Sequence, residues 1–92
     1  MKAQPLVRRK ELRDDGSMLE VVIWKLADPM PPCAHCFKYR LAYVVDGECV
    51  VRYDNERGKG DHRHIGGSES DYVFSSLDRL LADFRADVEN WK

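Results

Sequence analysis

Two histidines stand two positions apart in the segment Asp-His-Arg-His-Ile, at His62 and His64. An imidazole titrates near neutral pH, so it can act as a general acid or a general base. Residues two apart on a β-strand are separated by roughly 6.5–7 Å, because each residue adds ~3.3 Å. The two rings can therefore lie on either side of one phosphate. This spacing suits RNA cleavage without a metal, with one histidine accepting the 2′-hydroxyl proton and the other protonating the 5′-oxygen.

Such chemistry also needs cations for the developing negative charge, and the sequence supplies them nearby. Lys38, Arg40 and Arg52 precede the histidines, and Asp54 is placed to orient Arg52 or a histidine. The same residues also fit two other interpretations. The histidines can be ordinary solvated residues of an edge strand, and Asp54 with Asn55 can simply end a strand in a turn.

Metal binding is a further alternative, because Cys33-Ala-His-Cys36 has the spacing of a zinc knuckle and His62 and His64 would complete a Cys2His2 set. However, zinc signatures separate the histidines by three to five residues. We therefore expect reduced thiols, no metal and no cofactor, with Cys49 as a small core residue. The Gly58–Gly60 stretch lacks Walker spacing, so nucleotide binding is not expected.

Alternating polar and apolar residues around turn signals predict the strands that carry these side chains. The expected strands are 6–13, 18–26, 37–45, 48–55 and 61–65, and residues 72–74 are a further extended candidate. The Pro-rich segment 28–35 is irregular, since its prolines block both a helix and a central strand. Alternation within these strands places His62 and His64 on the same face as Lys38, Arg40 and Arg52.

The hairpin turns fix the expected registers. Three-residue loops ending in glycine set Lys10 opposite Glu20 and Leu12 opposite Met18. In the second hairpin they set Tyr43 opposite Cys49, Leu41 opposite Val51 and Tyr39 opposite Tyr53. The tyrosines would then form part of an apolar core.

The C-terminal segment predicts an amphipathic helix that begins after Ser75 or Ser76 and ends near Trp91. Its apolar residues recur at helical spacing: Leu77, Leu80, Leu81, Phe84, Val88 and Trp91. The expected fold is therefore α+β, an antiparallel β-meander of about five strands with one C-terminal helix packed on one face. The opposite face is left open to a partner.

Composition sets further bounds. A chain of 92 residues with a net charge of −1 predicts one domain, 1–92, without the general basicity of many nucleic-acid-binding proteins. An odd cysteine count of 3 argues against a disulfide framework. No apolar run is long enough for a membrane span, and no signal-peptide core is evident. We expect a cytoplasmic protein that does not engage a membrane.

Three runs of the sequence resemble the TumE family of toxins from bacterial type II toxin–antitoxin systems. They are Phe-Lys-Tyr-Arg-Leu-Ala-Tyr-Val from residue 37, Val-Arg-Tyr-Asp-Asn from residue 51 and Lys-Gly-Asp-His-Arg-His-Ile from residue 59. The family motif falls on Lys38, Tyr39, Arg40, Arg52, Tyr53, Asp54, Asn55, Lys59, His62 and His64.

This resemblance implies a growth-inhibiting toxin that acts on RNA or the ribosome and is neutralised by a cognate helix-turn-helix antitoxin. We expect His62, His64, Asp54 and Arg52 to be catalytic in a possible metal-independent endoribonuclease. The expected substrate-binding residues are Lys38, Arg40, Tyr53, Asn55 and Lys59. The alternative is a non-catalytic binding module that blocks a protein or nucleic-acid target by occupying it.

Overall fold

The computed structural model describes residues 3–91 as an antiparallel sheet with one helix. The strands are β1 (Ala3–Leu12), β2 (Met18–Leu26), β3 (Phe37–Val45), β4 (Glu48–Glu56), β5 (Gly60–Ile65) and β6 (Ser68–Asp71), and the helix is α1 (Leu77–Asn90). The strands lie side by side in chain order, so the sheet is a simple meander. The predicted α+β class is confirmed, with six strands in place of about five.

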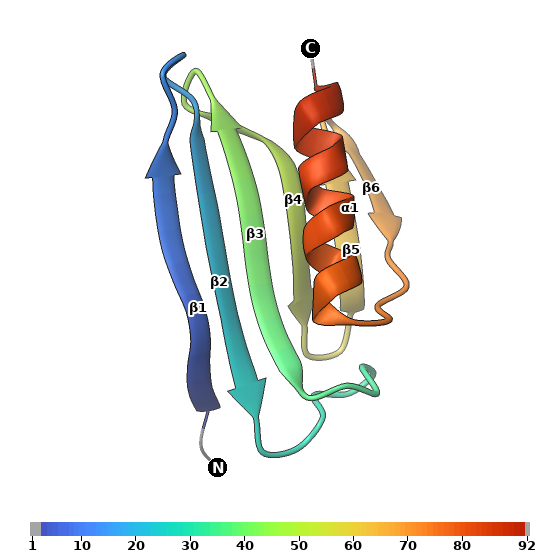
Figure 1. Ribbon diagram of the computed structural model, residues 1–92. Coiled ribbons are helices and arrows are strands. Elements are labelled where there is room, and N and C mark those ends of the chain that lie inside the picture. Colours follow the sequence, from blue (N-terminus) through green and yellow to red (C-terminus); the bar gives the residue numbers. More distant parts are fainter. Residues whose placement is uncertain (1–2, 92) are drawn as a thin grey trace.

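The helix α1 lies over the β4–β5 half of one sheet face and leaves β1 and β2 uncovered (Figure 1). Its N-cap is Ser76, whose hydroxyl accepts the Arg79 N–H at 3.1 Å. Leu80, Phe84 and Val88 form its buried side and pack on apolar residues of the sheet. The helix predicted from the 3.6-residue periodicity is therefore confirmed.

Aromatic and aliphatic side chains from the central strands meet this helix. Tyr39, Leu41, Tyr43, Val51 and Tyr53 are all buried, and together with Ile23 they form the floor of the core. Two tyrosine hydroxyls form hydrogen bonds with the helix. Tyr53 donates to Asp87 of α1, and Tyr72 donates to Asp83 at 2.6 Å. These bonds anchor the helix to the strands at two points along its length.

The first hairpin has the predicted register, with Lys10 opposite Glu20 and Leu12 opposite Met18. The register predicted for the second hairpin is wrong by two residues, because Tyr43 pairs with Val51 and Leu41 with Tyr53.

The turn explains the error. Asp46 and Gly47 both have positive φ angles, of 52° and 80°, which is a two-residue hairpin turn of type I′. Val50 is then an extra residue in β4, and this β-bulge returns Val51 and Tyr53 to the helix side. As a consequence Cys49 is exposed, and its prediction as a core residue is wrong.

The irregular segment between β2 and β3 folds back across one end of the sheet (Figure 1). The Gly58 N–H donates to the Pro31 carbonyl at 2.9 Å, which ties the β4–β5 loop to this segment. Within the described range, 3–91, no helix is both long and apolar enough to span a bilayer.

Candidate functional site

The sheet face opposite α1, which we call the open face, carries two rows of side chains that run across the strands. Cross-strand partners define the first row as Arg40, Asp54, His62 and Asp71. The second row consists of Ala42, Arg52, His64 and Glu69. Directly paired side chains in an antiparallel sheet have Cβ atoms about 5 Å apart. The face therefore gathers cations, imidazoles and carboxylates within one small area.

Arg52 lies between Asp54 and His64 in this area. Its Nη2 atom is 2.9 Å from Nε2 of His64, and its Nε atom is 3.3 Å from Oδ2 of Asp54. The contact with Asp54 is an ion pair and not an aligned hydrogen bond. A guanidinium has no acceptor, so Nε2 of His64 must accept the hydrogen bond and is unprotonated. His64 thus offers a lone pair, which is the state a general base requires.

His62 is the most enclosed of the charged and titratable side chains in these two rows, with only 9% of its side chain exposed. Its Nδ1 atom lies 3.4 Å from Oε2 of Glu69 and 3.9 Å from Oδ1 of Asp71. Within residues 3–91 neither ring nitrogen has a hydrogen-bond partner. A buried polar group without a partner is costly, so it commonly marks a site that awaits a ligand or a water molecule.

The remaining predicted cations have partners of their own. Arg40 forms an ion pair with Glu20 of β2, with 3.0 Å between Nη1 and Oε1. Lys38 donates from Nζ to the Asn55 carbonyl, at the end of the sheet. Lys59, in the β4–β5 loop, lies 3.8 Å from Glu69. Of these three, Lys59 is the one joined to the histidines, through that shared carboxylate.

Tyr53 and Asn55 lie on the opposite side of the sheet from the histidines, and both are fully buried. The Asn55 amide accepts the Tyr39 N–H at 3.0 Å and donates to the Phe37 carbonyl at 2.7 Å. The structure therefore places Asn55 where it holds the ends of β3 and β4 together. Neither side chain reaches the open face.

The zinc set considered from the sequence is not brought together. His62 and His64 lie on the open face, whereas Cys33 contacts Asp61 on the other side of the sheet. A different set gathers there, with Cys33, His35 and Asp61 offering ligand atoms within 4.8 Å of one another. Asp61 accepts hydrogen bonds from the Cys33 thiol (3.0 Å), His35 Nε2 (2.9 Å) and the Tyr39 hydroxyl (2.6 Å).

The tautomer of His35 argues against metal binding at this set. Its Nδ1 atom accepts the Phe37 N–H at 3.1 Å, so the ring proton is on Nε2 and points at Asp61. A metal ion at this set would need a lone pair on Nε2, where the proton lies. The pKa of the Cys33 thiol is raised to about 11 by burial and by its hydrogen bond to Asp61, which disfavours the thiolate ligand. We interpret the set as a buried hydrogen-bond network.

Sequence reasoning missed Glu69 because it missed β6. The strand Ser-Glu-Ser-Asp has no apolar residue, so no alternation signals it. A usable signal was the Gly66-Gly67 pair, which is typical of a hairpin turn and pairs Ile65 with Ser68 and His64 with Glu69.

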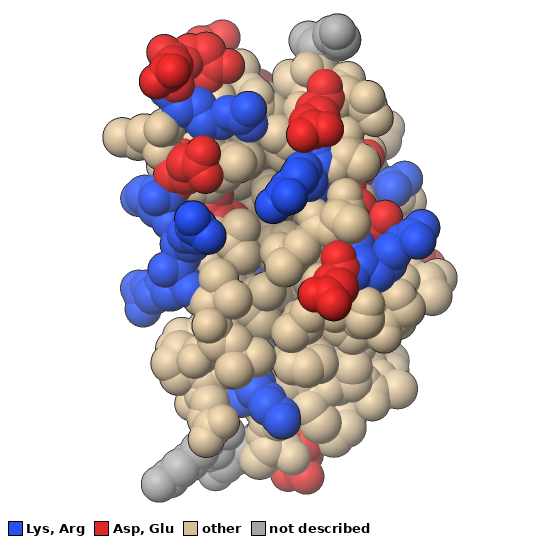
Figure 2. Space-filling model, in the orientation of Figure 1, with Lys and Arg blue, Asp and Glu red and all other residues tan. Residues whose placement is uncertain are grey.

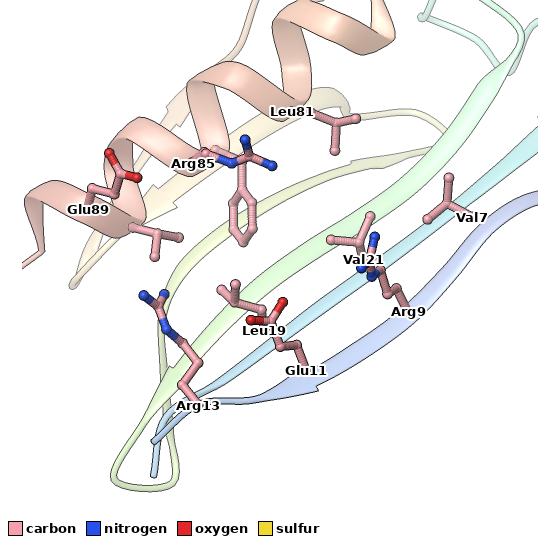
Figure 3. A pocket seen from close by; sticks show the side chains of 11 residues that line it. Val7, Arg9, Glu11, Arg13, Leu19, Val21, Leu81, Arg85 and Glu89 are labelled. Atoms are coloured by element: carbon pink, nitrogen blue, oxygen red, sulfur yellow. The ribbon is translucent and has the colours of Figure 1, made fainter. Parts of the chain in front are cut away.

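A groove lies far from the histidines, on the helix side between α1 and the uncovered strands β1 and β2 (Figure 3). Its apolar floor consists of Val7, Leu19, Val21, Leu81, Phe84 and Val88. Its charged side chains are Arg9, Glu11, Arg13, Arg85 and Glu89. Figure 2 shows basic and acidic side chains interspersed over this face. The groove therefore lacks the histidine and arginine grouping that distinguishes the open face.

Comparison with known proteins gives one match. A family model described as Toxin TumE covers residues 2–92 of the chain. No curated protein matches, and no solved structure matches.

Proposed function

This chain belongs to the TumE family of toxins, and we propose that it is the toxin of a type II toxin–antitoxin system that cleaves RNA at the open face. The observation that carries the proposal is the grouping of His62, His64 and Arg52 on the sheet face that α1 does not cover. The proposed site of action is the cytoplasm, where RNA and ribosomes are the available targets.

The proposed reaction is attack by the 2′-oxygen on the adjacent phosphorus. His64 accepts the 2′-hydroxyl proton on its unprotonated Nε2 atom once Arg52 has turned to the phosphate, and the new O–P bond forms as the P–O5′ bond breaks. His62, in its protonated form, gives a proton to the departing 5′-oxygen. The products are a 2′,3′-cyclic phosphate and a 5′-hydroxyl, so atoms and charge balance without an added reactant.

Cations would lower the barrier by stabilising the extra charge on the phosphate oxygens. Arg52 is positioned for this role, since its Nε is held by Asp54 and its Nη2 by His64. Lys59 adds a second, more mobile cation with an exposed side chain. Lys38 and Arg40 lie farther along the same face, where they suit neighbouring phosphates. Tyr53 and Asn55 would act by positioning β4, because both are buried.

A competing function is a binding module that stops growth by occupying its target. The same face supports it, because basic residues bind a phosphate backbone whether or not cleavage follows. The two functions differ in what the histidines must do. Cleavage needs proton transfer by His62 and His64, whereas occupancy needs only binding to the target, which the basic residues around them can supply.

The deciding experiment uses His62→Ala/His64→Ala protein. We expect this double variant to keep its fold and the part of its RNA affinity that the arginines and lysines supply, but to lose growth arrest and RNA cleavage. Circular dichroism and an RNA-binding assay supply the controls. Full toxicity of a folded double variant would refute catalysis and favour occupancy.

The proposed partner is a cognate helix-turn-helix antitoxin that contributes an acidic segment. Such a segment would gain charge-assisted hydrogen bonds with Arg40 and Arg52 and would cover the histidines at the same time. The β1 edge and the groove beside α1 offer other places for an inhibitor to bind. Substitutions on the two faces distinguish them.

A further inference from the structure

One carboxylate oxygen sits at the centre of the proposed site. Oε2 of Glu69 lies 3.4 Å from His62 Nδ1, 3.5 Å from His64 Nε2 and 3.8 Å from Lys59 Nζ. The contacts come from β5 and from the β4–β5 loop, whereas Glu69 itself belongs to β6. A single anionic oxygen thus lies beside two groups that could donate to an oxygen of a phosphate, Lys59 Nζ and His62 Nδ1, and next to the proposed base His64.

None of these contacts is a well-formed hydrogen bond. The three distances are longer than the 2.7–2.9 Å typical of charge-assisted bonds. His62 Nδ1 has no hydrogen-bond partner within the part of the chain described here, although its side chain is nine-tenths buried. Glu69 therefore occupies the position without forming good hydrogen bonds to the groups around it. An anion that fits better could form those hydrogen bonds and would bind more favourably.

The strand that carries Glu69 is also the part of the sheet best able to yield. All four residues of β6 are exposed, and β6 lies at the edge of the sheet with β5 as its sole neighbour in the strand order. The Glu69 side chain is 43% exposed, so it can turn into solvent without opening the core. Stability at such an edge is low compared with that of the central strands.

We propose that Glu69 occupies a phosphate-binding position formed by Lys59 and His62 beside His64, and that a phosphate group binds there by displacing its carboxylate. The proposal deepens the function proposed above, since the phosphate in question would be that of an RNA chain. It also gives Glu69 a regulatory role. The carboxylate screens the site until a ligand with a phosphate replaces it.

Displacement of Glu69 would also prepare the base, His64, for reaction. A phosphate bound beside Lys59 would place negative charge close to His64. The Arg52 side chain, which contacts His64, could then reach that charge. Arg52 would turn from His64 Nε2 to the phosphate, and the lone pair of His64 would be released. The site therefore couples the arrival of a phosphate to the availability of its base.

The test is titration with inorganic phosphate, followed by the NMR signals of the His62 and His64 ring protons. We compare wild type with Glu69→Gln, which keeps the shape of the side chain and removes its charge. Glu48→Gln is the matched control, because Glu48 is exposed at the β3–β4 turn and the variant changes the net charge equally. Lys59→Gln provides the opposite change.

We expect Glu69→Gln to bind phosphate about five- to tenfold more tightly than wild type, because a like charge next to the ligand is removed. Glu48→Gln should change the affinity by less than about twofold, since a distant exposed charge is screened. Lys59→Gln should weaken binding. A single-stranded oligoribonucleotide, titrated in parallel, should show the same order if the natural ligand is an RNA phosphodiester. A response to inorganic phosphate alone would assign the site to free phosphate.

Equal or weaker phosphate binding by Glu69→Gln would overturn the proposal, as would phosphate that leaves both histidines unperturbed in every variant. These outcomes are separate from the test of catalysis. Phosphate affinity does not depend on RNA cleavage, and loss of cleavage in the double histidine variant does not depend on Glu69.

Discussion

The Nη2 atom of Arg52 lies 2.9 Å from Nε2 of His64, across the pairing of β4 with β5. A residue that usually binds phosphate is thus held by a neutral imidazole, and the imidazole is held as an acceptor by the guanidinium. This contact gives Nε2 of His64 the role of hydrogen-bond acceptor, because a guanidinium can only donate. It is the basis for giving His64 the role of base and His62 the role of acid.

The first prediction concerns the chemistry of cleavage. If the 2′-oxygen is the nucleophile, a substrate with 2′-O-methyl groups should resist cleavage completely, because no proton can be removed and no cyclic phosphate can form. Cleavage of ordinary RNA should continue in excess EDTA and leave 2′,3′-cyclic phosphate ends. Mass spectrometry of the fragments measures both the extent of cleavage and the chemical nature of the ends. Linear 3′-hydroxyl ends, or inhibition by EDTA, would point to metal-dependent hydrolysis.

The second prediction concerns phosphate contacts. Each phosphate neutralised on a single strand contributes about 0.7 to the slope of log K against log salt. Arg52→Gln should therefore reduce the slope for single-stranded RNA by about 0.7. Arg9→Gln is the control, because Arg9 lies in the groove on the other side of the sheet. Equal slopes for wild type and Arg52→Gln would remove Arg52 from the binding face.

The strands that the sequence predicts well are those whose own residues define them. The bounds of β2 and β3 match their prediction, because Val, Ile and aromatic residues fill both strands and turn residues flank them. The strand β6 and Glu69 were missed because Ser68–Asp71 forms a strand only by pairing with β5. The Gly66-Gly67 pair before it signals a hairpin turn, but no residue within the polar segment itself indicates a strand.

The register of β3 with β4 depends on one extra residue in β4. The bulge at Val50 shifts β4 by one position relative to β3, and no side-chain pattern in the hairpin requires it. By contrast, the face shared by Arg52 and His64 follows from alternation alone, so it was predictable. The contact of Cys33 with Asp61 was not, because it depends on how the Pro-rich segment packs across the end of the sheet.

The third prediction tests Asn55, which the sequence predicts as a substrate-binding residue but the structure buries. Asn55→Ala would leave the Tyr39 N–H and the Phe37 carbonyl without their partner. An unsatisfied buried group costs about 1–3 kcal/mol, so we expect a loss of about 2–4 kcal/mol in the free energy of unfolding. Urea denaturation measures it. A fully stable Asn55→Ala protein with impaired RNA binding would instead give Asn55 a direct role in binding.

The fourth prediction concerns alkaline pH. The pKa of Cys33 is about 11 in the folded protein, against an ordinary value of 9.0. A raised pKa means that the thiol stabilises the fold below pH 9, and that this contribution is lost as the pH rises to about 11. We expect wild type to lose about 1–3 kcal/mol more than Cys33→Ala across that range, by urea denaturation. Tyr39, whose pKa is also raised by burial, affects both proteins almost alike, because Cys33 is the smallest of the causes that raise the pKa of Tyr39. Parallel losses in the two proteins would contradict the assignment.

The last prediction locates the antitoxin. Co-expression with the neighbouring reading frame should yield a stable complex whose association rate falls with salt, as expected for an acidic segment on a basic face. Arg40→Glu/Arg52→Glu protein should lose both toxicity and the complex, because the same two guanidinium groups serve RNA and inhibitor. The matched control is Arg9→Glu/Arg85→Glu, which makes the same charge change beside the groove. If the control variant loses the complex while the first variant keeps it, the antitoxin binds between α1 and β1, and it inhibits without covering the histidines.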